Sequence, residues 1–544
     1  MVTGDAGGRR PLADRTLNRT IELAVESRPD HLALRDETRQ LSYADTWEAA
    51  SRFAAGYRAL GVGRQEPVLL MLDNHVDSAL AWLGLSFNAS METLVNTAYK
   101  GHYLAHLVND SGARFAVVEE AYLDRFLEVE SDALEAIIVR PSKGDDVLRS
   151  SRAPVERRGP RVIPFAALSA YPGAGPEPVS AWDLLAILYT SGTTGISKGA
   201  VLAHAAAFTT AEFTGRQGSG DTRYIVAPQF HVAGQWGGVY RALIPGSTAY
   251  IASGFHATTF WDEVRETGAT TTQLVGAMPE FLLRQPPKPD DRDNPLRDVY
   301  MTPVAADVQE FRRRFGVDVV TGFGSTEAGT ILVDDDPDKV APRRCGRAHP
   351  DVEVRLVDEH DREVPDGQVG EAVVRPKLPW TVMIRWQGLP ERSAEAWRNG
   401  WLHSGDALRR DVDGIYYYVD RVDDAIRRRG ENVSSFEVEL EVAGHPDIRE
   451  AAAIAVPSEY SEDEIKVVAV RAEGSALTEK DLVLYLAERM PYFMVPRYVE
   501  FVDDMPRTPT NKIRKGELRA AGLGRAWDRE AAGIVVSRTG VVTQ

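Results

Sequence analysis

The sequence predicts an α/β fold in which a large N-terminal domain of two mainly parallel sheets with helices precedes a small α+β C-terminal domain. First, helical patterns alternate with short apolar runs over most of the chain. Second, from about residue 345 the pattern changes to hairpins, which indicates a small antiparallel β subdomain. Third, two helices and three strands follow residue 423 in a segment the size of a small domain. We expect domains over residues 1–422 and 423–544.

The N-terminal elements follow from hydrophobic spacing. Residues 41–60 place apolar side chains three and four apart and end before Gly61, which predicts a helix with a glycine stop. Residues 67–72 read PVLLML, a buried strand, and residues 77–90 are again helical. Short β-rich runs bounded by turns predict further strands at 115–120, 136–140, 183–190, 222–228, 247–252, 270–275 and 317–323. Ligands of such folds bind beyond the carboxyl ends of the strands.

The later elements are shorter. Pro365, Asp366 and Gly367 form a turn between two strand-like stretches, which predicts a hairpin. The C-terminal module is expected to contain helices at 434–444 and 478–490 and strands at 451–456, 465–470 and 498–502. Residues 522–544 show little periodicity and are expected to be peripheral.

Composition limits the function. The 544 residues carry a formal net charge of −17, which argues against nucleic-acid partners and against an anionic membrane surface. Cys345 is the only cysteine, so neither an internal disulfide nor a thiolate zinc cluster is expected. No apolar stretch approaches eighteen residues, and no signal peptide is evident. We therefore expect a cytoplasmic protein without a membrane partner.

A hydroxyl- and glycine-rich segment, YTSGTTGISKGA, spans residues 189–200. Its small residues expose backbone amides, its hydroxyls can donate, and Lys198 supplies a positive charge, so it could hold phosphate groups. It is not a standard P-loop, because Ser197 occupies the position of the second glycine. The remaining motifs must decide between a phosphate site and a surface loop.

Five further strings follow in order: APQFHVAG, GFGSTEAG, WLHSGDALRRDVDGIYYYVDR, RRRGENVSSFEVE and PRTPTNKIRKGEL. Together with YTSGTTGISKG, their order and spacing resemble the adenylate-forming superfamily of acyl-CoA synthetases, adenylation domains and luciferases. The similarity is greatest to the crotonobetaine/carnitine-CoA ligase-like branch and covers about residues 16–520. It implies an AMP-forming ligase that joins a carboxylic acid to ATP, releases pyrophosphate, and passes the acyl group to a thiol.

The resemblance implies a role for each matching residue. The loop that holds the β- and γ-phosphates corresponds to Thr190, Ser191, Gly192, Thr193, Thr194, Gly195 and Lys198. Phe323 and Gly324 match the adenine-stacking segment, Thr326 a donor to the α-phosphate, and Glu327 the Mg²⁺ ligand. Asp406 matches the ribose-binding carboxylate. Arg421 matches a second ribose or phosphate contact, with a structural salt bridge as the rival interpretation.

Catalysis is implied to alternate between two closed states. Lys512 matches the lysine that bridges the carboxylate and the α-phosphate, and Asp423 matches the hinge of a mobile C-terminal domain. Rotation would withdraw Lys512 and bring Gly430 and Glu431 to the tunnel of the thiol, for which coenzyme A is the expected acceptor. The residues with expected catalytic roles are Lys512, Lys198, His231, Thr326 and Glu327.

His231 matches the histidine or aromatic residue of the acyl pocket, with a packing histidine as the alternative. The expected pocket wall comprises His231, Trp236, Gly276, Met278, Met301 and Thr302. This mixture suits a small polar or aromatic acid better than a long alkyl chain. Residues 301–307 read MTPVAAD where the family has a glycine-rich string, so the pocket depth is open. The acid, the oligomeric state (monomer or homodimer) and the acceptor also remain open. A carrier-protein thiol, an amine, nitrite activation and a non-catalytic nucleotide binder are the alternatives.

Overall fold

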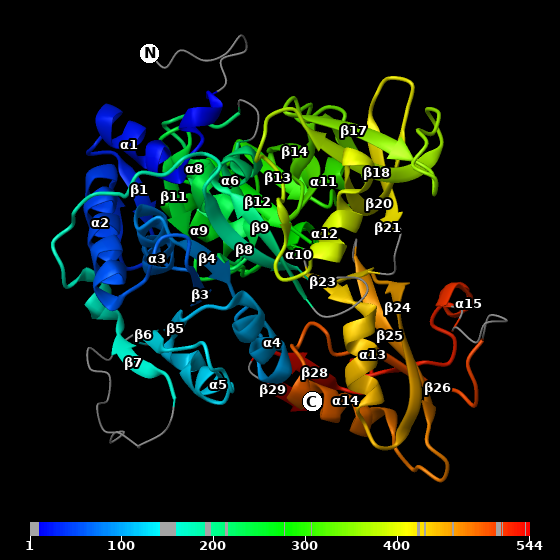
Figure 1. Ribbon diagram of the computed structural model, residues 1–544. Helices are drawn as coiled ribbons and strands as arrows, with labels where there is room; N and C mark the ends of the chain where they lie inside the picture. The colour runs from blue at the N-terminus through cyan, green and yellow to red at the C-terminus, as the bar shows by residue number, and fades with distance from the viewer. Residues whose placement is uncertain are drawn as a thin grey trace. The chain divides into compact units, whose positions relative to one another are not determined.

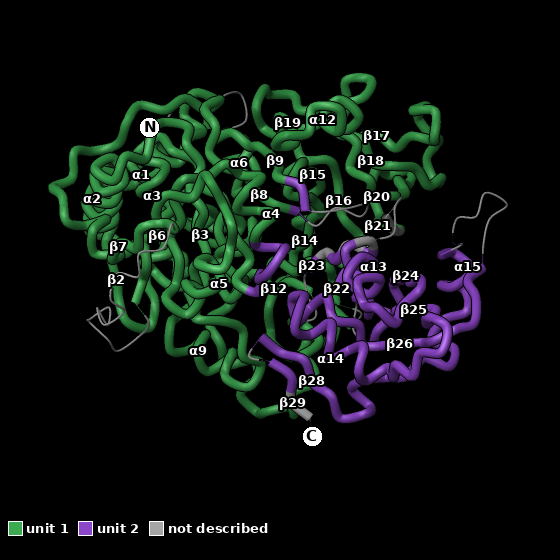
Figure 2. Tube along the Cα trace, turned by 60° about the horizontal axis from the view of Figure 1, so that its bottom comes forward, with its two compact units in different colours: residues 1–97, 105–189, 199–420 green, residues 98–104, 190–198, 421–544 purple. Residues whose placement is uncertain are grey.

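The computed structural model describes residues 10–141, 159–190, 197–212, 216–276, 278–305, 307–421, 425–428, 431–459, 462–506, 513, 515–538 and 540–543 (Figure 1). The chain forms two compact units (Figure 2). The first comprises residues 1–97, 105–189 and 199–420, and the second comprises 98–104, 190–198 and 421–544.

A thirteen-stranded sheet forms the centre of the first unit. Its spatial order is β17 (Val352–Val357), β18 (Val369–Pro376), β20 (Leu402–Arg410), β21 (Tyr416–Arg421), β16 (Arg344–Ala348), β15 (Gly329–Asp334), β14 (Asp318–Ser325), β13 (Asp298–Thr302), β12 (Thr271–Val275), β10 (Thr222–Ile225), β11 (Thr248–Ile251), β1 (Leu32–Arg35) and β2 (Gln40–Ser42). Strands β14, β13, β12, β10, β11 and β1 are parallel to their neighbours in that series. The pairs from β14 to β21 and from β17 to β20 are antiparallel.

The second sheet of this unit has eight strands, ordered β19 (Arg385–Trp386), β9 (Lys198–Ala203), β8 (Leu184–Thr190), β4 (Met91–Leu94), β3 (Pro67–Met71), β5 (Phe115–Glu119), β6 (Ala136–Arg140) and β7 (Arg161–Pro164). The pairs linking β8, β4, β3, β5, β6 and β7 are parallel. The predicted α/β fold class is therefore confirmed. The antiparallel strands extend the larger parallel sheet by hydrogen bonding.

Helices cover these sheets (Figure 1). They are η1 (Leu12–Asp14), α1 (Leu17–Ser27), α2 (Tyr43–Leu60), α3 (Val76–Phe87), α4 (Gly101–Ser111), η2 (Glu120–Tyr122), α5 (Leu123–Leu127), η3 (Phe165–Ser169), α6 (His204–Ala211), α7 (Val232–Gly234), the π-helix η4 (Gln235–Tyr240), α8 (Arg241–Leu243), α9 (Phe260–Thr267), α10 (Met278–Leu283), α11 (Val308–Phe315), α12 (Pro390–Ala396) and η5 (Arg398–Gly400). The helix predicted at 41–60 is α2, which begins with a capping box between Ser42 and Asp45 and ends at Gly61. No helix in the described ranges is long and apolar enough to cross a membrane.

Two apolar cores lie on opposite faces of the parallel strands β10 to β14. One contains Ile225 of β10 together with Trp236 and Val239 of the helical segment 232–243. The other contains Leu274 of β12 and Phe311 of α11. Because side chains alternate along a strand, neighbouring residues of β10, β12 and β13 belong to different layers. This alternation decides which strand residues reach the helical segment 232–243.

The second unit contains an α+β module whose main sheet is ordered β24 (Ile448–Pro457), β25 (Asp463–Arg471), β26 (Tyr498–Phe501) and β27 (Trp527–Asp528). The other elements are β22 (Ala425–Arg428), β23 (Glu431–Ser434), α13 (Ser435–Ala443), α14 (Glu479–Arg489), α15 (Lys515–Ala520), β28 (Ile534–Ser537) and β29 (Gly540–Thr543). The expected helices and strands are present, and the tail that was expected to be peripheral contributes the edge strand β27 and the hairpin of β28 and β29. Residue Arg529 is fully buried and donates to the carbonyls of Pro496 and Ile534, which ties the last hairpin to the module.

Candidate active site

The GFGSTEAG motif forms the end of β14 and the turn into β15. Phe323 and Gly324 lie in β14, while Thr326 and Glu327 lie in the turn and are partly exposed. A β-carbon on Gly324 would stand 2.1 Å from the carbonyl oxygen of Gly329, so only glycine permits this close approach. The turn thus holds a hydroxyl and a carboxylate at the carboxyl end of a parallel strand, where α/β folds bind ligands.

The sheet brings an aromatic residue from a distant strand against Phe323. The rings of Phe323 and Tyr418, a residue of β21, lie 5.7 Å apart between centroids. Asp406, on the neighbouring strand β20, is 3% exposed, and its backbone amide donates to Ser404 Oγ at 3.1 Å. Burial raises the pKa of the Cys345 thiol to about 12, and the negative charge of Asp406 also raises it. Sequence reasoning missed Tyr418, although the run of three tyrosines before Val419 was a usable signal.

His231 precedes the helical segment that packs on the sheet. Its backbone amide donates to the Pro228 carbonyl at 3.1 Å, and its carbonyl accepts from Gly234 and Gln235. A β-carbon on Gly234 would stand 2.1 Å from the Pro228 oxygen, so the glycine of QFHVAG permits this tight turn. The His231 side chain is partly exposed, with its ring 4.8 Å from that of Phe230. The turn therefore fixes the backbone of His231 in the connection between β10 and the helical segment 232–243.

Two of the expected pocket residues, Gly276 and Thr302, are joined by a hydrogen bond, whereas Met278 and Met301 pack in or against the core that contains Phe311. The backbone amide of Gly276 donates to the carbonyl of Thr302 at 3.1 Å, at the ends of β12 and β13. Met301 is fully buried in the core that contains Phe311, and its sulfur accepts from the Ala305 amide. Met278 packs against the same core. Because side chains alternate along β13, Thr302 and Met301 lie on opposite faces of the sheet.

Trp236 is fully buried and links the helical segment to the second sheet. Its indole nitrogen donates to Glu92 Oε1 of β4 at 3.1 Å. Glu92 is itself fully buried, and this burial raises its pKa to about 8, although hydrogen bonds from nearby side chains oppose the shift. At neutral pH the folded protein therefore holds Glu92 mainly as the neutral acid.

We expect the Glu92→Gln variant to change how stability depends on pH. The folded pKa of about 8 exceeds the ordinary value of 4.5, so the folded state binds this proton more tightly than the unfolded chain. The stabilisation is complete below pH 4.5 and declines as pH rises toward 8. The decline amounts to about 3–5 kcal/mol, at 1.4 kcal/mol per pKa unit. Glutamine is neutral throughout, so chemical denaturation from pH 5 to 9 should show a flatter stability curve for the variant.

The matched control is Glu48→Gln, which removes an exposed carboxylate that pairs with Arg52 on α2. That variant should keep the wild-type pH dependence within about 0.5 kcal/mol. A Glu92→Gln curve parallel to the wild-type curve would contradict a raised pKa at Glu92.

The phosphate-loop motif is described only at its ends. Thr190 ends β8 and Lys198 begins β9, while Ser191, Gly192, Thr193, Thr194 and Gly195 lie outside the described residues. Within the second unit, Ser197 Oγ donates to Glu437 Oε1 of α13 at 3.3 Å. Burial raises the pKa of Glu437 to about 7. This contact connects the end of the loop with the helix that follows the RRRGEN motif.

The other C-terminal site residues are described only in part. Glu431 begins β23, whereas Asp423, Gly430 and Lys512 lie outside the described residues, as does the side chain of Arg421. The roles expected for these residues stay predictions.

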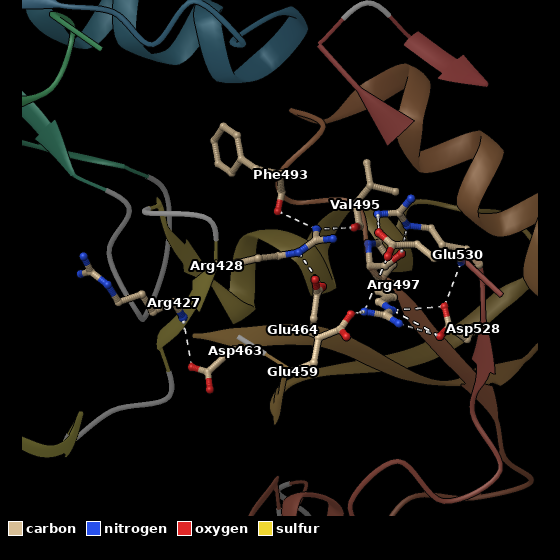
Figure 3. A network of polar contacts seen from close by, with 12 residues as sticks. Arg427, Arg428, Glu459, Asp463, Glu464, Phe493, Val495, Arg497, Asp528 and Glu530 are labelled. Carbon is tan, nitrogen blue, oxygen red and sulfur yellow. Dashed lines mark hydrogen bonds and ion pairs between the residues drawn. The ribbon is translucent and has the colours of Figure 1, made fainter. Parts of the chain in front are cut away.

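Arg428 of the RRRGEN motif is a structural residue of the module. Figure 3 shows its guanidinium between the Glu464 carboxylate and the carbonyl groups of Phe493 and Val495. The ion pair with Glu464 measures 2.6 Å, and Nη1 donates to the two carbonyls at 2.9 and 2.8 Å. The side chain of Arg427 points away from this network (Figure 3). Of these two arginines, Arg428 therefore anchors β22 to the rest of the module.

An α/β unit with this motif at the end of β14, together with an α+β module, defines an adenylate-forming enzyme. The chain belongs to the AMP-binding enzyme family: that family model matches residues 21–382, and the model of the AMP-binding enzyme C-terminal domain matches residues 437–512. The predicted membership is therefore confirmed.

Relatives support the same assignment. A crotonobetaine/carnitine-CoA ligase of Citrobacter koseri is 31% identical over 497 residues, which cover 88% of this chain and 93% of that protein. A benzoate CoA ligase of Burkholderia xenovorans is similar in structure, with a TM-score of 0.66, 26% identity and coverage of 92% and 98%. The amide bond synthetase McbA of Marinactinospora thermotolerans shares the fold, with a TM-score of 0.77, 23% identity and coverage of 92% and 99%.

Proposed function

We propose that the protein activates a small organic acid as an acyl-adenylate, with release of pyrophosphate, and transfers the acyl group to the thiol of coenzyme A. The observation that carries this proposal is that one sheet holds Phe323 of β14, Tyr418 of β21 and Asp406 of β20, with the rings of Phe323 and Tyr418 in contact. An aromatic pair can stack on adenine, and a buried carboxylate can accept hydrogen bonds from ribose hydroxyls. The family membership and the CoA ligase relatives point to the same chemistry.

Charge neutralisation is the main task of the first step, because the carboxylate and the α-phosphate repel each other. We assign Thr326 as a donor to the α-phosphate, with His231 at the acyl group and Lys198 at the phosphates. Glu327 would hold Mg²⁺, and its partly exposed carboxylate on a turn is the kind of oxygen ligand that this ion uses together with substrate phosphates. Mg²⁺, when bound, neutralises charge on those phosphates. Among the described residues no group of three or more His, Cys, Asp or Glu could hold a metal by itself.

The second step needs a different set of residues. We propose that residues 423–544 form a lid that turns about Asp423, so that Lys512 serves adenylation, whereas Gly430 and Glu431 serve thiol transfer. McbA is an amide bond synthetase with the same fold, so an amine acceptor is a competing hypothesis for this chain.

Pyrophosphate release with a panel of short aliphatic and aromatic acids, with and without coenzyme A, tests the function. We expect release that depends on ATP, Mg²⁺ and one class of acid, and an acyl-CoA product detectable by mass spectrometry only when coenzyme A is present. Parallel reactions should contain an amine, or nitrite with an aminoaryl acid. Pyrophosphate release with nitrite and an aminoaryl acid, in the absence of any thioester, would overturn the CoA ligase proposal in favour of that alternative.

A further inference from the structure

Three polar side chains share one face of the parallel strands in the first unit. Arg223 of β10 is paired in register with Thr271 of β12, and Gln273 of β12 is paired with Tyr300 of β13. Their sequence neighbours, which include Tyr224, Leu274, Val299 and Met301, belong to the apolar core of the opposite face. Arg223, Gln273 and Tyr300 therefore face the helical segment 232–243, and a β-carbon on Gly237 of that segment would stand 3.0 Å from Gln273 Oε1. We call these three residues, with Arg241, the polar layer.

Arg223 is buried without a carboxylate. It is 3% exposed, and its Nη2 donates to Gln273 Oε1 at 3.3 Å, whereas its Nε is buried without a hydrogen-bond partner. Within the described parts of the chain, no Asp or Glu side chain forms an ion pair with it. Burial lowers the pKa of Arg223, and the positive charge of Arg241 lowers it further. A buried charge in this state is costly unless an anion accompanies it.

Arg241 adds a second positive charge to the layer. It is 7% exposed, its Nε donates to the Ala211 carbonyl at 3.0 Å, and its guanidinium lies 5.0 Å from the centre of the Tyr300 ring. Burial lowers the pKa of Arg241 to about 10, so it stays charged at neutral pH. Two guanidinium groups in one buried layer make it strongly electropositive.

Two strands of the layer, β12 and β13, end at or next to residues of the proposed acyl pocket. Tyr300 is two residues before Thr302 on β13, and Gln273 is three residues before Gly276. At ~3.3 Å per residue, the layer is about 7–10 Å from the strand ends along the strands. A group attached to the far end of a small acid could span that distance while the reacting carboxylate stays near His231.

We propose that Arg223, supported by Gln273 and Arg241, binds an anionic group at the far end of the acid, so that the substrate is a dicarboxylate or a similar dianionic acid. This inference rests on the proposed function and names its substrate class. An anion accepting hydrogen bonds from Arg223 would satisfy the buried Nε and supply the missing countercharge. A tail with a positive charge, such as the trimethylammonium group of carnitine, would be repelled. The substrate class that we assign to this chain therefore differs from the substrates for which its crotonobetaine/carnitine-CoA ligase relatives are named.

Pairs of acids with the same number of carbon atoms test the proposal. Pyrophosphate release should be compared for 4-carboxybenzoate against 4-methylbenzoate and for adipate against hexanoate, in the wild type, Arg223→Met and Arg223→Lys. We expect the wild type to favour the dianionic member of at least one pair by about 30-fold or more in kcat/KM. In Arg223→Met this ratio should fall to about one, and Arg223→Lys should retain an intermediate ratio because it keeps the charge but loses the planar fork.

The thermal stability of Arg223→Met distinguishes a substrate-binding role of Arg223 from a purely structural role. Replacing an uncompensated buried charge by an apolar side chain is neutral or stabilising, so the Tm of ligand-free Arg223→Met should equal or exceed that of the wild type. The control Arg392→Met removes an exposed arginine that pairs with Glu395 on α12, and it should keep the wild-type ratio. A lower Tm for Arg223→Met with an unchanged acid ratio would overturn the proposal and show a structural arginine.

Binding of the same acids, followed by thermal shift and by titration calorimetry without ATP, distinguishes two kinds of failure. If no acid releases pyrophosphate but 4-carboxybenzoate binds the wild type at least tenfold more tightly than Arg223→Met, the proposed function fails and the anionic site stands. If pyrophosphate is released equally with both members of each pair, the function stands and the anionic site is overturned. If the wild type shows neither pyrophosphate release nor tighter binding of the dianionic acid, the proposed function and the anionic site are both overturned.

Discussion

Lys512→Ala should slow adenylation by about 10²- to 10³-fold and leave thioester formation from a supplied acyl-adenylate within about threefold of the wild type. Removing a positioned donor from the developing negative charge typically has an effect of this size. The motif match assigns Lys512 to the carboxylate and α-phosphate of the first step only. Pyrophosphate release and single-turnover transfer from the synthetic adenylate to coenzyme A measure the two steps separately, with the acid that reacts fastest in the wild type.

The matched control is Lys515→Ala, three residues further along the same basic segment. Lys515 Nζ pairs with Glu439 at 2.7 Å and donates to Ser435 Oγ at 2.8 Å, so its charge is already used inside the second unit. We expect both half-reactions of this control to remain within about threefold of the wild type. An equal loss of both half-reactions in Lys512→Ala would refute a role restricted to adenylation.

Arg428→Ala should destabilise the C-terminal module by about 3–5 kcal/mol, because it leaves the buried Glu464 carboxylate without its partner. The substitution also removes the donor to the carbonyls of Phe493 and Val495. Calorimetry should show a lower transition temperature for the module. Hydrogen exchange should locate the loss in β24 and β25, because Glu464 lies in β25 and β24 pairs with that strand.

Arg427→Ala is the natural comparison, since it changes the adjacent arginine, whose side chain points away from the network (Figure 3). We expect a change in stability below about 1 kcal/mol for this variant. Equal destabilisation by the two substitutions would show that the motif as a whole, and not the Arg428–Glu464 pair, stabilises the module. The double variant Arg428→Met with Glu464→Gln provides a second test, because it removes both charges of the pair. If the pair is specific, the double variant should be substantially more stable than Arg428→Ala; otherwise the two should be about equally unstable.

Much of the fold could be predicted because its signals are local. The spacing of apolar residues between 41 and 60, with Ser42 before it and Gly61 after it, is sufficient to define α2. The glycines of QFHVAG and GFGSTEAG identify tight turns, since Gly234 and Gly324 approach backbone oxygens that leave no room for a side chain. How the tail beyond residue 522 is anchored could not be predicted, because its strands are short and the anchoring depends on Arg529 reaching carbonyls of the module.

The sequence by itself determined the class of enzyme, the order of helices and strands, and the motifs that match a nucleotide and an acyl group, because these depend on short-range patterns. Only the tertiary structure decided which residues share a layer. It placed Tyr418 in contact with Phe323, and it buried Met301 in the core on the face opposite to that of Thr302. It also brought Arg223, Gln273 and Arg241 together from separate elements. The physical reason is that strand pairing and the alternation of side chains set these positions, and both depend on contacts between segments far apart in the chain.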